Sequence, residues 1–174
     1  MGDIMKRGGR AISIGLSAVM GLTAAGCGQP GTDSTQESVP YVPEVVGIYE
    51  AEEAAGTGNV KAAVSLAKEG YSGYVEGFEN DDDSCTFAVD IPETGFYDLN
   101  FVCASLGGEK ANYVKIDGES TGTIHTENGD FSDCVLERVY LEAGTHKVSV
   151  VKYWGWISLD CLKVTTSQPI SSSL

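Results

Sequence analysis

The sequence has little positive charge. Its 174 residues contain 11 lysines and arginines against 25 acidic residues, which gives a formal net charge of −14. A protein that binds DNA or RNA through phosphates needs a basic surface that releases counterions, so this balance argues against nucleic acid as a partner. It also argues against electrostatic attachment to anionic lipid. Such a chain suits an exported protein, or one that binds cations or neutral ligands.

The short motifs that carry catalysis are also missing. The sequence contains no G-x-S-x-G, no H-E-x-x-H and no Walker loop. Its two histidines, His125 and His146, belong to no nucleophile constellation, and we expect both on the surface of strands. Glycosidases use two carboxylates that flank a cleft, but acidic residues are so numerous here that pairs arise by chance. We therefore expect no enzyme activity.

No two cysteines form a C-x-x-C pair, which argues against zinc binding and thioredoxin-like chemistry. Four of them, Cys85, Cys103, Cys134 and Cys161, follow the first 27 residues, and in an exported protein they allow three full disulfide pairings. Free cysteine is also a common small core residue. The spacing leaves both alternatives open.

The first 27 residues predict a secretory signal, because a basic start is followed by an apolar stretch too short to span a bilayer comfortably (Ala11–Ala25). The ending Ala-Gly-Cys27 resembles the bacterial lipoprotein cleavage box, although Ala24 stands where Leu is usual. In that box the cysteine is lipidated and becomes the new N-terminus. Cys27 would then be the anchor of a cell-surface lipoprotein that touches the membrane only through its lipid. The alternatives are ordinary signal peptidase cleavage, with an extracellular product, or an uncleaved anchor.

The remaining chain divides into three parts by composition. Residues 28–46 are rich in Gly, Ser, Thr, Gln and Pro without an apolar period, which is typical of a flexible linker. Residues 47–165 form the expected folded domain, and residues 166–174 a polar tail.

Within the domain, apolar residues alternate with polar ones at period two, as in Cys85–Ile91, Tyr97–Cys103 and Val148–Val150. Turn residues separate such runs, most clearly Asp117-Gly118, which predicts a two-residue hairpin. Pro92–Gly95 and Glu142–Thr145 predict two more turns. The segment Val60–Glu69 fits a helix or a strand. About ten short strands predict an all-β fold, an antiparallel sandwich of the jelly-roll type.

Two carboxylates open this domain. If Tyr49–Glu53 is a strand, Glu50 and Glu52 point to the same side. If the last strand lies beside the first, Asp160 joins them, and a calcium ion would relieve their repulsion. The alternative is a solvated outer face. Asp81–Asp83 could likewise be a second cation site, but such a charge run more often forms a solvated loop.

Five motifs occur in order between Gly47 and Val164: Tyr-Glu-Ala-Glu at 49–52, the Gly/Tyr-rich segment 70–78, the turn 92–99, the turn 142–145 and Leu-Asp-Cys-Leu-Lys-Val at 159–164. Together they resemble carbohydrate-binding modules of family 35 and the related family 6, which are galactose-binding-like sandwiches. The resemblance implies a structural calcium held by Glu50, Glu52, Asp160 and backbone carbonyls.

It also implies a sugar site at one end of the sandwich, made by aromatic rings and a few polar groups. The matching positions are Tyr71, Tyr74, Asn112, Phe131, Trp154, Trp156 and Ser158. Phe131 stands where Trp is common and Ser158 where Asn often is. Each aromatic has an alternative in the core: Tyr74 falls in a strand that packs, and one of the two tryptophans could be interior.

Two functions from different classes follow. The first is a monomeric, tethered module that binds a plant or microbial polysaccharide or oligosaccharide. The second is a structural or adhesive sandwich that binds a protein partner and buries its aromatic rings. A truncated piece of a glycoside hydrolase is a third alternative. Xylan, mannan, galactose-containing glycans and uronic acids all lie within the family's range, and the negative charge disfavours acidic glycans.

Overall fold

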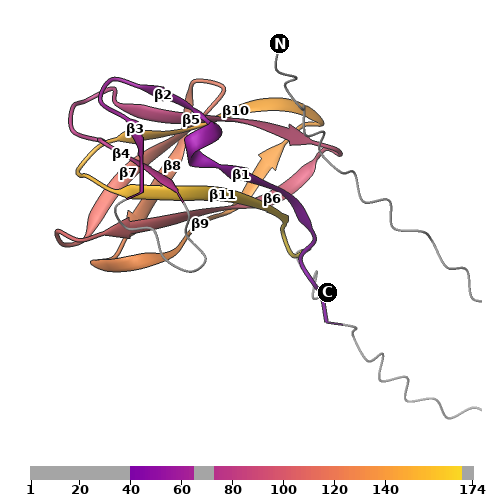
Figure 1. Cartoon of the computed structure of the whole chain (residues 1–174). Helices are drawn as coiled ribbons and strands as arrows, with labels where there is room; N and C mark the ends of the chain where they lie inside the picture. Colours follow the sequence, from indigo (N-terminus) through magenta and orange to yellow (C-terminus); the bar gives the residue numbers. More distant parts are fainter. Residues whose placement is uncertain (1–39, 65–72, 170–174) are drawn as a thin grey trace, which may run out of the picture. The chain divides into compact units, whose positions relative to one another are not determined.

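The computed structural model describes residues 40–64 and 73–169, which form two antiparallel sheets (Figure 1). The first sheet has the order β3 (Lys61–Ala63), β4 (Tyr74–Glu76), β11 (Ser158–Thr166), β6 (Gly95–Ser105) and β9 (Gly129–Leu141), and β1 (Val45–Glu50) also pairs with β11. The second has the order β2 (Ala55–Thr57), β5 (Ser84–Ile91), β10 (Gly144–Lys152), β7 (Lys110–Ile116) and β8 (Glu119–Thr126). The predicted all-β sandwich is confirmed.

The core lies between the sheets because their strands alternate as expected. In β5, Cys85, Phe87 and Val89 are buried while Ala88 and Asp90 are exposed. The same alternation in β6 and β10 directs their apolar side chains into one cluster with those of β5. Burial of this apolar surface is the main force that holds the sheets together.

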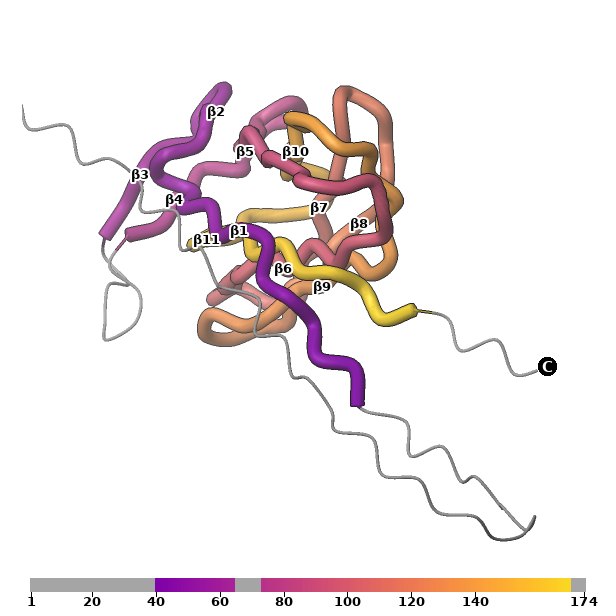
Figure 2. Tube along the Cα trace, turned by 90° about the vertical axis from the view of Figure 1, so that its right-hand side faces the viewer, coloured from indigo at the N-terminus to yellow at the C-terminus, as the bar shows by residue number. Residues whose placement is uncertain are grey.

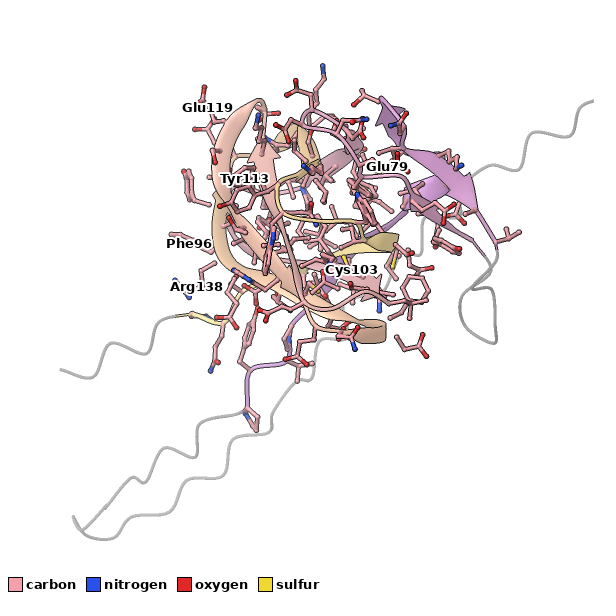
Figure 3. All side chains as sticks on the ribbon, turned by 90° about the vertical axis from the view of Figure 1, so that its left-hand side faces the viewer. Glu79, Phe96, Cys103, Tyr113, Glu119 and Arg138 are labelled. Atoms are coloured by element: carbon pink, nitrogen blue, oxygen red, sulfur yellow. The ribbon has the colours of Figure 1, made fainter. Side chains whose placement is uncertain are left out.

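The four cysteines of the domain, Cys85, Cys103, Cys134 and Cys161, are buried and carry free thiols. Cys103 belongs to the core cluster and is labelled in the interior of the sandwich in Figure 3. Within the described residues, no helix is long and apolar enough to cross a membrane.

The hairpin between β7 and β8 turns at Asp117 and Gly118, as the sequence predicts. Both residues have positive φ, 52° and 91°, which is the geometry of a type I′ turn. Asp117 also ties the turn to β10: Oδ1 accepts from the Lys147 amide at 2.8 Å, and Oδ2 lies 2.7 Å from His146 Nδ1. The other ring nitrogen of His146 lies 2.8 Å from the Glu142 carbonyl. The imidazole therefore connects the β7–β8 turn at Asp117 to the β9–β10 turn at Glu142.

The first and last strands pair, with Glu50 opposite Cys161, and the tube in Figure 2 shows β1 running beside β11. On its other side β11 pairs with β6, and the register shifts between Leu159 and Cys161. The extra residue in this irregularity is Asp160. Strand β1 begins at Val45, inside the predicted linker. The amide of Glu44, just before it, donates to Thr166 Oγ1 at 2.9 Å, so the sandwich begins before residue 47.

In the run Asp81–Asp83, Asp81 and Asp82 are exposed in a turn, as the solvated-loop alternative expects, whereas Asp83 is buried. Asp83 is 3% exposed, and its carboxylate accepts three backbone N–H groups, from Asn59 and Glu79 at 3.0 Å and from Asn80 at 2.7 Å. These hydrogen bonds hold the pKa of Asp83 below its usual value. Asp83 is therefore neither solvated nor a vacant cation ligand, because amide donors occupy its oxygens.

The ambiguous segment Val60–Glu69 contains strand β3, so its helical reading is wrong over Lys61–Ala63. Its residues from 65 onward lie outside the described part of the chain.

Candidate functional site

A groove of about 890 Å³ opens at the end of the sandwich where β4, β6 and β11 meet two loops. The β6–β7 loop contributes Leu106 and Gly107, and the β10–β11 loop contributes Trp154, Gly155 and Trp156. Side chains of β3, β4, β7 and β10 and of the segment after β4 also line the groove. In Figure 3, Glu79, one of these residues, lies beside the purple strands β2–β4.

The two indoles are the most distinctive feature of the groove. Trp154 is 64% exposed and Trp156 is 66% exposed, so neither of them fills the core. Backbone hydrogen bonds hold the start of their loop: the Trp154 amide donates to the Ala111 carbonyl at 2.9 Å, and the Lys152 amide to the Asp83 carbonyl at 2.9 Å. Exposed, positioned indole faces offer flat apolar surfaces to a ligand.

Ser158 and Tyr74 also line the groove, as the predicted set requires. Ser158 is half-buried and lies opposite Ala104 on β6. Tyr74 is fully buried and packs edge-to-face against Phe131, with ring centroids 5.7 Å apart. Tyr74 therefore forms a wall of the groove, and its ring does not present a free stacking face.

Two predicted sugar contacts are absent from the groove lining, which corrects their assignment. Phe131 is only 9% exposed, because its ring packs in a buried cluster with Tyr74, Val102, Ala104 and Cys161. Asn112 is fully buried, and its Oδ1 accepts from the Tyr153 amide at 3.2 Å. Asn112 thus holds the start of the β10–β11 loop, which carries both tryptophans. Tyr71, the remaining aromatic candidate, lies outside the described residues, as does Cys27.

No motif in the sequence indicated the charged part of the groove. Its lining contains five charged residues: Lys61, Lys110, Lys152, Glu76 and Glu79. They come from four strands and the segment after β4, and no spacing in the sequence relates them. Leu106, 69% exposed at the rim, was missed for the same reason.

An acidic cluster lies farther along β11. Ligand atoms of Glu50, Asp160 and Cys161 all lie within 4.8 Å of one another. Burial raises the pKa of Glu50, and the charges of Asp160, Glu52 and Glu53 raise it further. Burial likewise raises the pKa of Asp160, with a smaller contribution from Glu52. Like charges therefore gather at this point, and a cation would relieve their repulsion.

Glu52, the third predicted ligand, is not among the residues whose ligand atoms converge, and only its charge acts on the cluster. Strand β1 ends at Glu50, and Ala51–Glu53 form a 3₁₀ turn, η1, so the two glutamates do not share one face of a strand. Ala51, the first residue of this turn, is buried in the core. Glu52 points toward Gly73, where an added Cβ would lie 2.1 Å from Glu52 Oε1.

The donor set fits a hard divalent cation. Two carboxylates converge and the charge of a third acts on both, which suits the oxygen ligands that calcium prefers. The thiol of Cys161 is a soft donor and does not suit that ion. No signal in the sequence pointed to Cys161, because its place in the cluster follows from its register opposite Glu50.

The chain is similar in sequence to parts of several carbohydrate-active enzymes. The chain is 36% identical over 124 residues to a mannan endo-1,4-beta-mannosidase of Thermothelomyces thermophilus, covering 70% of this chain and 25% of that protein. It spans at most a quarter of the length of the curated relatives it matches.

Solved structures show the same sandwich. A GH26-CBM35 beta-(1,4)-mannanase of Podospora anserina matches with a TM-score of 0.63 and 31% identity, over 72% of this chain and 28% of that one. A family 35 module of Clostridium thermocellum matches with a TM-score of 0.57 and 20% identity, over 73% of this chain and 100% of that one. A family 36 module solved with calcium and xylotriose matches with a TM-score of 0.56 and 14% identity, over 70% of this chain and 100% of that one.

An antiparallel sandwich with a groove of exposed indoles at one end defines a carbohydrate-binding module. The family described as "Carbohydrate binding module (family 35)" matches residues 47–167, and the chain belongs to this family. Its domain binds carbohydrate.

Proposed function

We propose that the domain binds neutral β-1,4-linked mannan, or oligosaccharides derived from it, in the groove beside Trp154 and Trp156. The observation that carries the proposal is the exposure of both indoles over an open groove. Aromatic faces stack on the apolar C–H patches of a pyranose ring. Support for mannan comes from the mannanases of Thermothelomyces and Podospora, which carry the matching module. An adhesive sandwich with buried aromatic rings is disfavoured by the same exposure.

The charges of the groove favour a neutral glycan. Lys152 Nζ lies 2.9 Å from Asp81 Oδ1, and Lys61 lies opposite Glu76 in the β3–β4 pair. Lys110 Nζ donates to the Gly107 carbonyl at 2.7 Å. Lys152 thus has a carboxylate partner, and Glu76 and Glu79 add negative charge to the lining. A polyanionic glycan would meet these carboxylates as well as the lysines, whereas a neutral glycan would not be repelled.

We propose that calcium occupies the acidic cluster, with Glu50 and Asp160 as ligands and Glu52 close by. When bound, the ion neutralises these carboxylates and joins β1 to β11. The fit of the donor set supports this assignment, and so does the family 36 module solved with calcium. Because Ser158 in the groove and Asp160 in the cluster share strand β11, the ion would also steady one groove wall.

We further propose that the chain is an exported, monomeric lipoprotein without catalytic activity, anchored through Cys27. The basic start, the short apolar stretch and the Ala-Gly-Cys ending support export and lipidation. The absence of catalytic motifs from the sequence supports a role in binding alone.

Titration of the full-length protein tests the proposal. Isothermal calorimetry with mannohexaose, xylohexaose, cellohexaose and oligogalacturonate is expected to show binding to mannohexaose, with a change in tryptophan fluorescence. Weaker or no binding is expected for oligogalacturonate. Failure to bind any neutral oligosaccharide would overturn the proposal, and release of reducing ends from mannan would overturn its non-catalytic part.

A further inference from the structure

We propose that Lys110 is a positioning residue that sets the two loop walls of the groove relative to each other. Its ammonium group holds the β6–β7 loop, and its aliphatic stem fills the space under Gly155 in the β10–β11 loop. The inference rests on the proposed function, because its main consequence is for sugar binding in that groove.

The first half of this arrangement is a network of hydrogen bonds. Lys110 Nζ donates to the carbonyl oxygens of Gly107 at 2.7 Å and of Glu109 at 3.3 Å. Ser105 Oγ donates to the Gly108 carbonyl at 2.6 Å, and the Gly108 amide donates to Asn128 Oδ1 at 2.8 Å. The β6–β7 loop is therefore held by Lys110, the first residue of β7, and by Asn128 in the loop between β8 and β9.

The second half is a close approach at Gly155. A Cβ added there would lie 1.9 Å from Lys110 Cδ and 2.9 Å from Cγ and Cε. Gly155 is buried, while its neighbours Trp154 and Trp156 are exposed. Its φ lies outside the left-handed region, so an L-residue can adopt its backbone conformation. Glycine is needed here for space, and the lysine stem is what uses that space.

This contact couples the indoles to the opposite rim. A methyl group at Gly155 must displace the Lys110 stem or lift the tryptophan loop. Displacing the stem disturbs the Gly107 contact, and lifting the loop moves both indoles relative to Leu106. Either response changes the shape of the groove, whereas a lysine that only served solubility would have no such effect.

A set of substitutions in the full-length protein tests this coupling. Gly155→Ala is expected to weaken mannohexaose binding by about tenfold, as overpacking of a close contact does. Lys110→Ala removes the stem, so the double variant Gly155→Ala/Lys110→Ala is expected to bind more tightly than Gly155→Ala alone. Gly95→Ala is the matched control, because the nearest atom to a Cβ there lies 3.8 Å away and the site is remote from the groove lining.

Two readouts separate this inference from the proposed function. Calorimetry gives the affinities, and the emission maximum of the tryptophans without sugar reports on the loop itself. Wild-type affinity in Gly155→Ala, or a double variant as weak as Gly155→Ala, would overturn the inference. If the wild-type protein does not bind mannohexaose, the proposed function fails. The emission maximum then decides the inference: it must shift in Gly155→Ala and return in the double variant.

Discussion

Among single side chains, the exposed indoles are the clearest proposed anchors for a sugar in the groove. Replacing Trp154 or Trp156 by alanine is expected to weaken mannohexaose binding by about tenfold each, roughly 1.4 kcal/mol, because a stacking face is lost. The melting temperature should change little, since both rings lie mostly in solvent. Calorimetry and thermal unfolding of the same samples measure the two effects.

Tyr140→Ala is the matched control for the indole substitutions. Tyr140 is 56% exposed and packs against Phe96 at 5.5 Å. Figure 3 shows Phe96 and Arg138 on the opposite side of the view from Glu79, which lines the groove. Equal losses in this control and the tryptophan variants would mean that the indoles have no special role.

The acidic cluster allows a second prediction for a single residue. Raised pKa values for Asp160 and Glu50 mean that the fold favours their protonated forms. Their stabilising contribution is present below the unfolded pKa, about 4, and is lost as the pH rises through the raised folded values. Without calcium, Asp160→Asn is therefore expected to melt at the same or a higher temperature than the wild type at pH 7.

Added calcium should raise the melting temperature of the wild type at pH 7 and leave that of Asp160→Asn unchanged. Differential scanning fluorimetry in chelator and in calcium makes the comparison. The assignment of Asp160 as a ligand would be contradicted by an equal calcium shift in both proteins.

Residue roles were the part of the site that the sequence predicted least well. The indoles and Ser158 line the groove, but Phe131 and Asn112 are buried. Phe131 packs in a cluster with Tyr74, Val102, Ala104 and Cys161, and Asn112 accepts from the Tyr153 amide. The sequence does not show that these neighbours come together. A resemblance transfers positions along a chain, whereas exposure depends on packing between strands.

At the level of elements, the β7–β8 hairpin offers a pH-dependent contact. The hydrogen bond to Asp117 raises the pKa of His146, and the Lys147 amide and His146 lower that of Asp117. The histidine contribution is present below about pH 6.5 and fades as the pH rises through its raised pKa. The aspartate contribution is present above about pH 4 and fades as the pH falls through its lowered pKa.

The stabilising effect of this pair should therefore be largest between about pH 4 and pH 6.5. Asp117→Asn, which still suits the left-handed turn position, is expected to melt about 2 °C below the wild type near pH 5.5. The difference should shrink at pH 8. Thermal unfolding across this range measures it, and His146→Gln should remove the same dependence. A constant difference at all pH values would show that the turn alone is affected.

Long strands were readable from the sequence, and short elements were not. Period-two runs identified β5, β6 and β10, because each long strand buries one face. The three-residue strands β2, β3 and β4 are too short to show a period. The turn η1, in which Ala51 is buried, replaces the strand expected at Glu52, and no alternation over three residues indicates such a turn.

For the molecule as a whole, pairing of the first strand with the last was an essential part of the sequence argument, and the structure confirms it. Strand β11 connects the two functional regions. Ser158 faces the groove, and Asp160 two residues later lies in the acidic cluster. The register of β11 against β6 shifts at Asp160, between the two regions. Cluster and groove therefore share one strand.

This linkage predicts that chelation weakens sugar binding without touching the indoles. Removing calcium leaves Glu50 and Asp160 to repel each other, which loosens the β1–β11 pair and the Ser158 wall of the groove. Mannohexaose affinity in EDTA is expected to fall by about threefold to tenfold relative to calcium, measured by calorimetry. Reciprocity requires that mannohexaose tighten calcium binding by the same factor. Asp160→Asn should bind sugar equally with and without calcium. Loss of affinity on chelation in that variant would place the ion elsewhere, and unchanged affinity in the wild type would show that strand β11 does not transmit the effect.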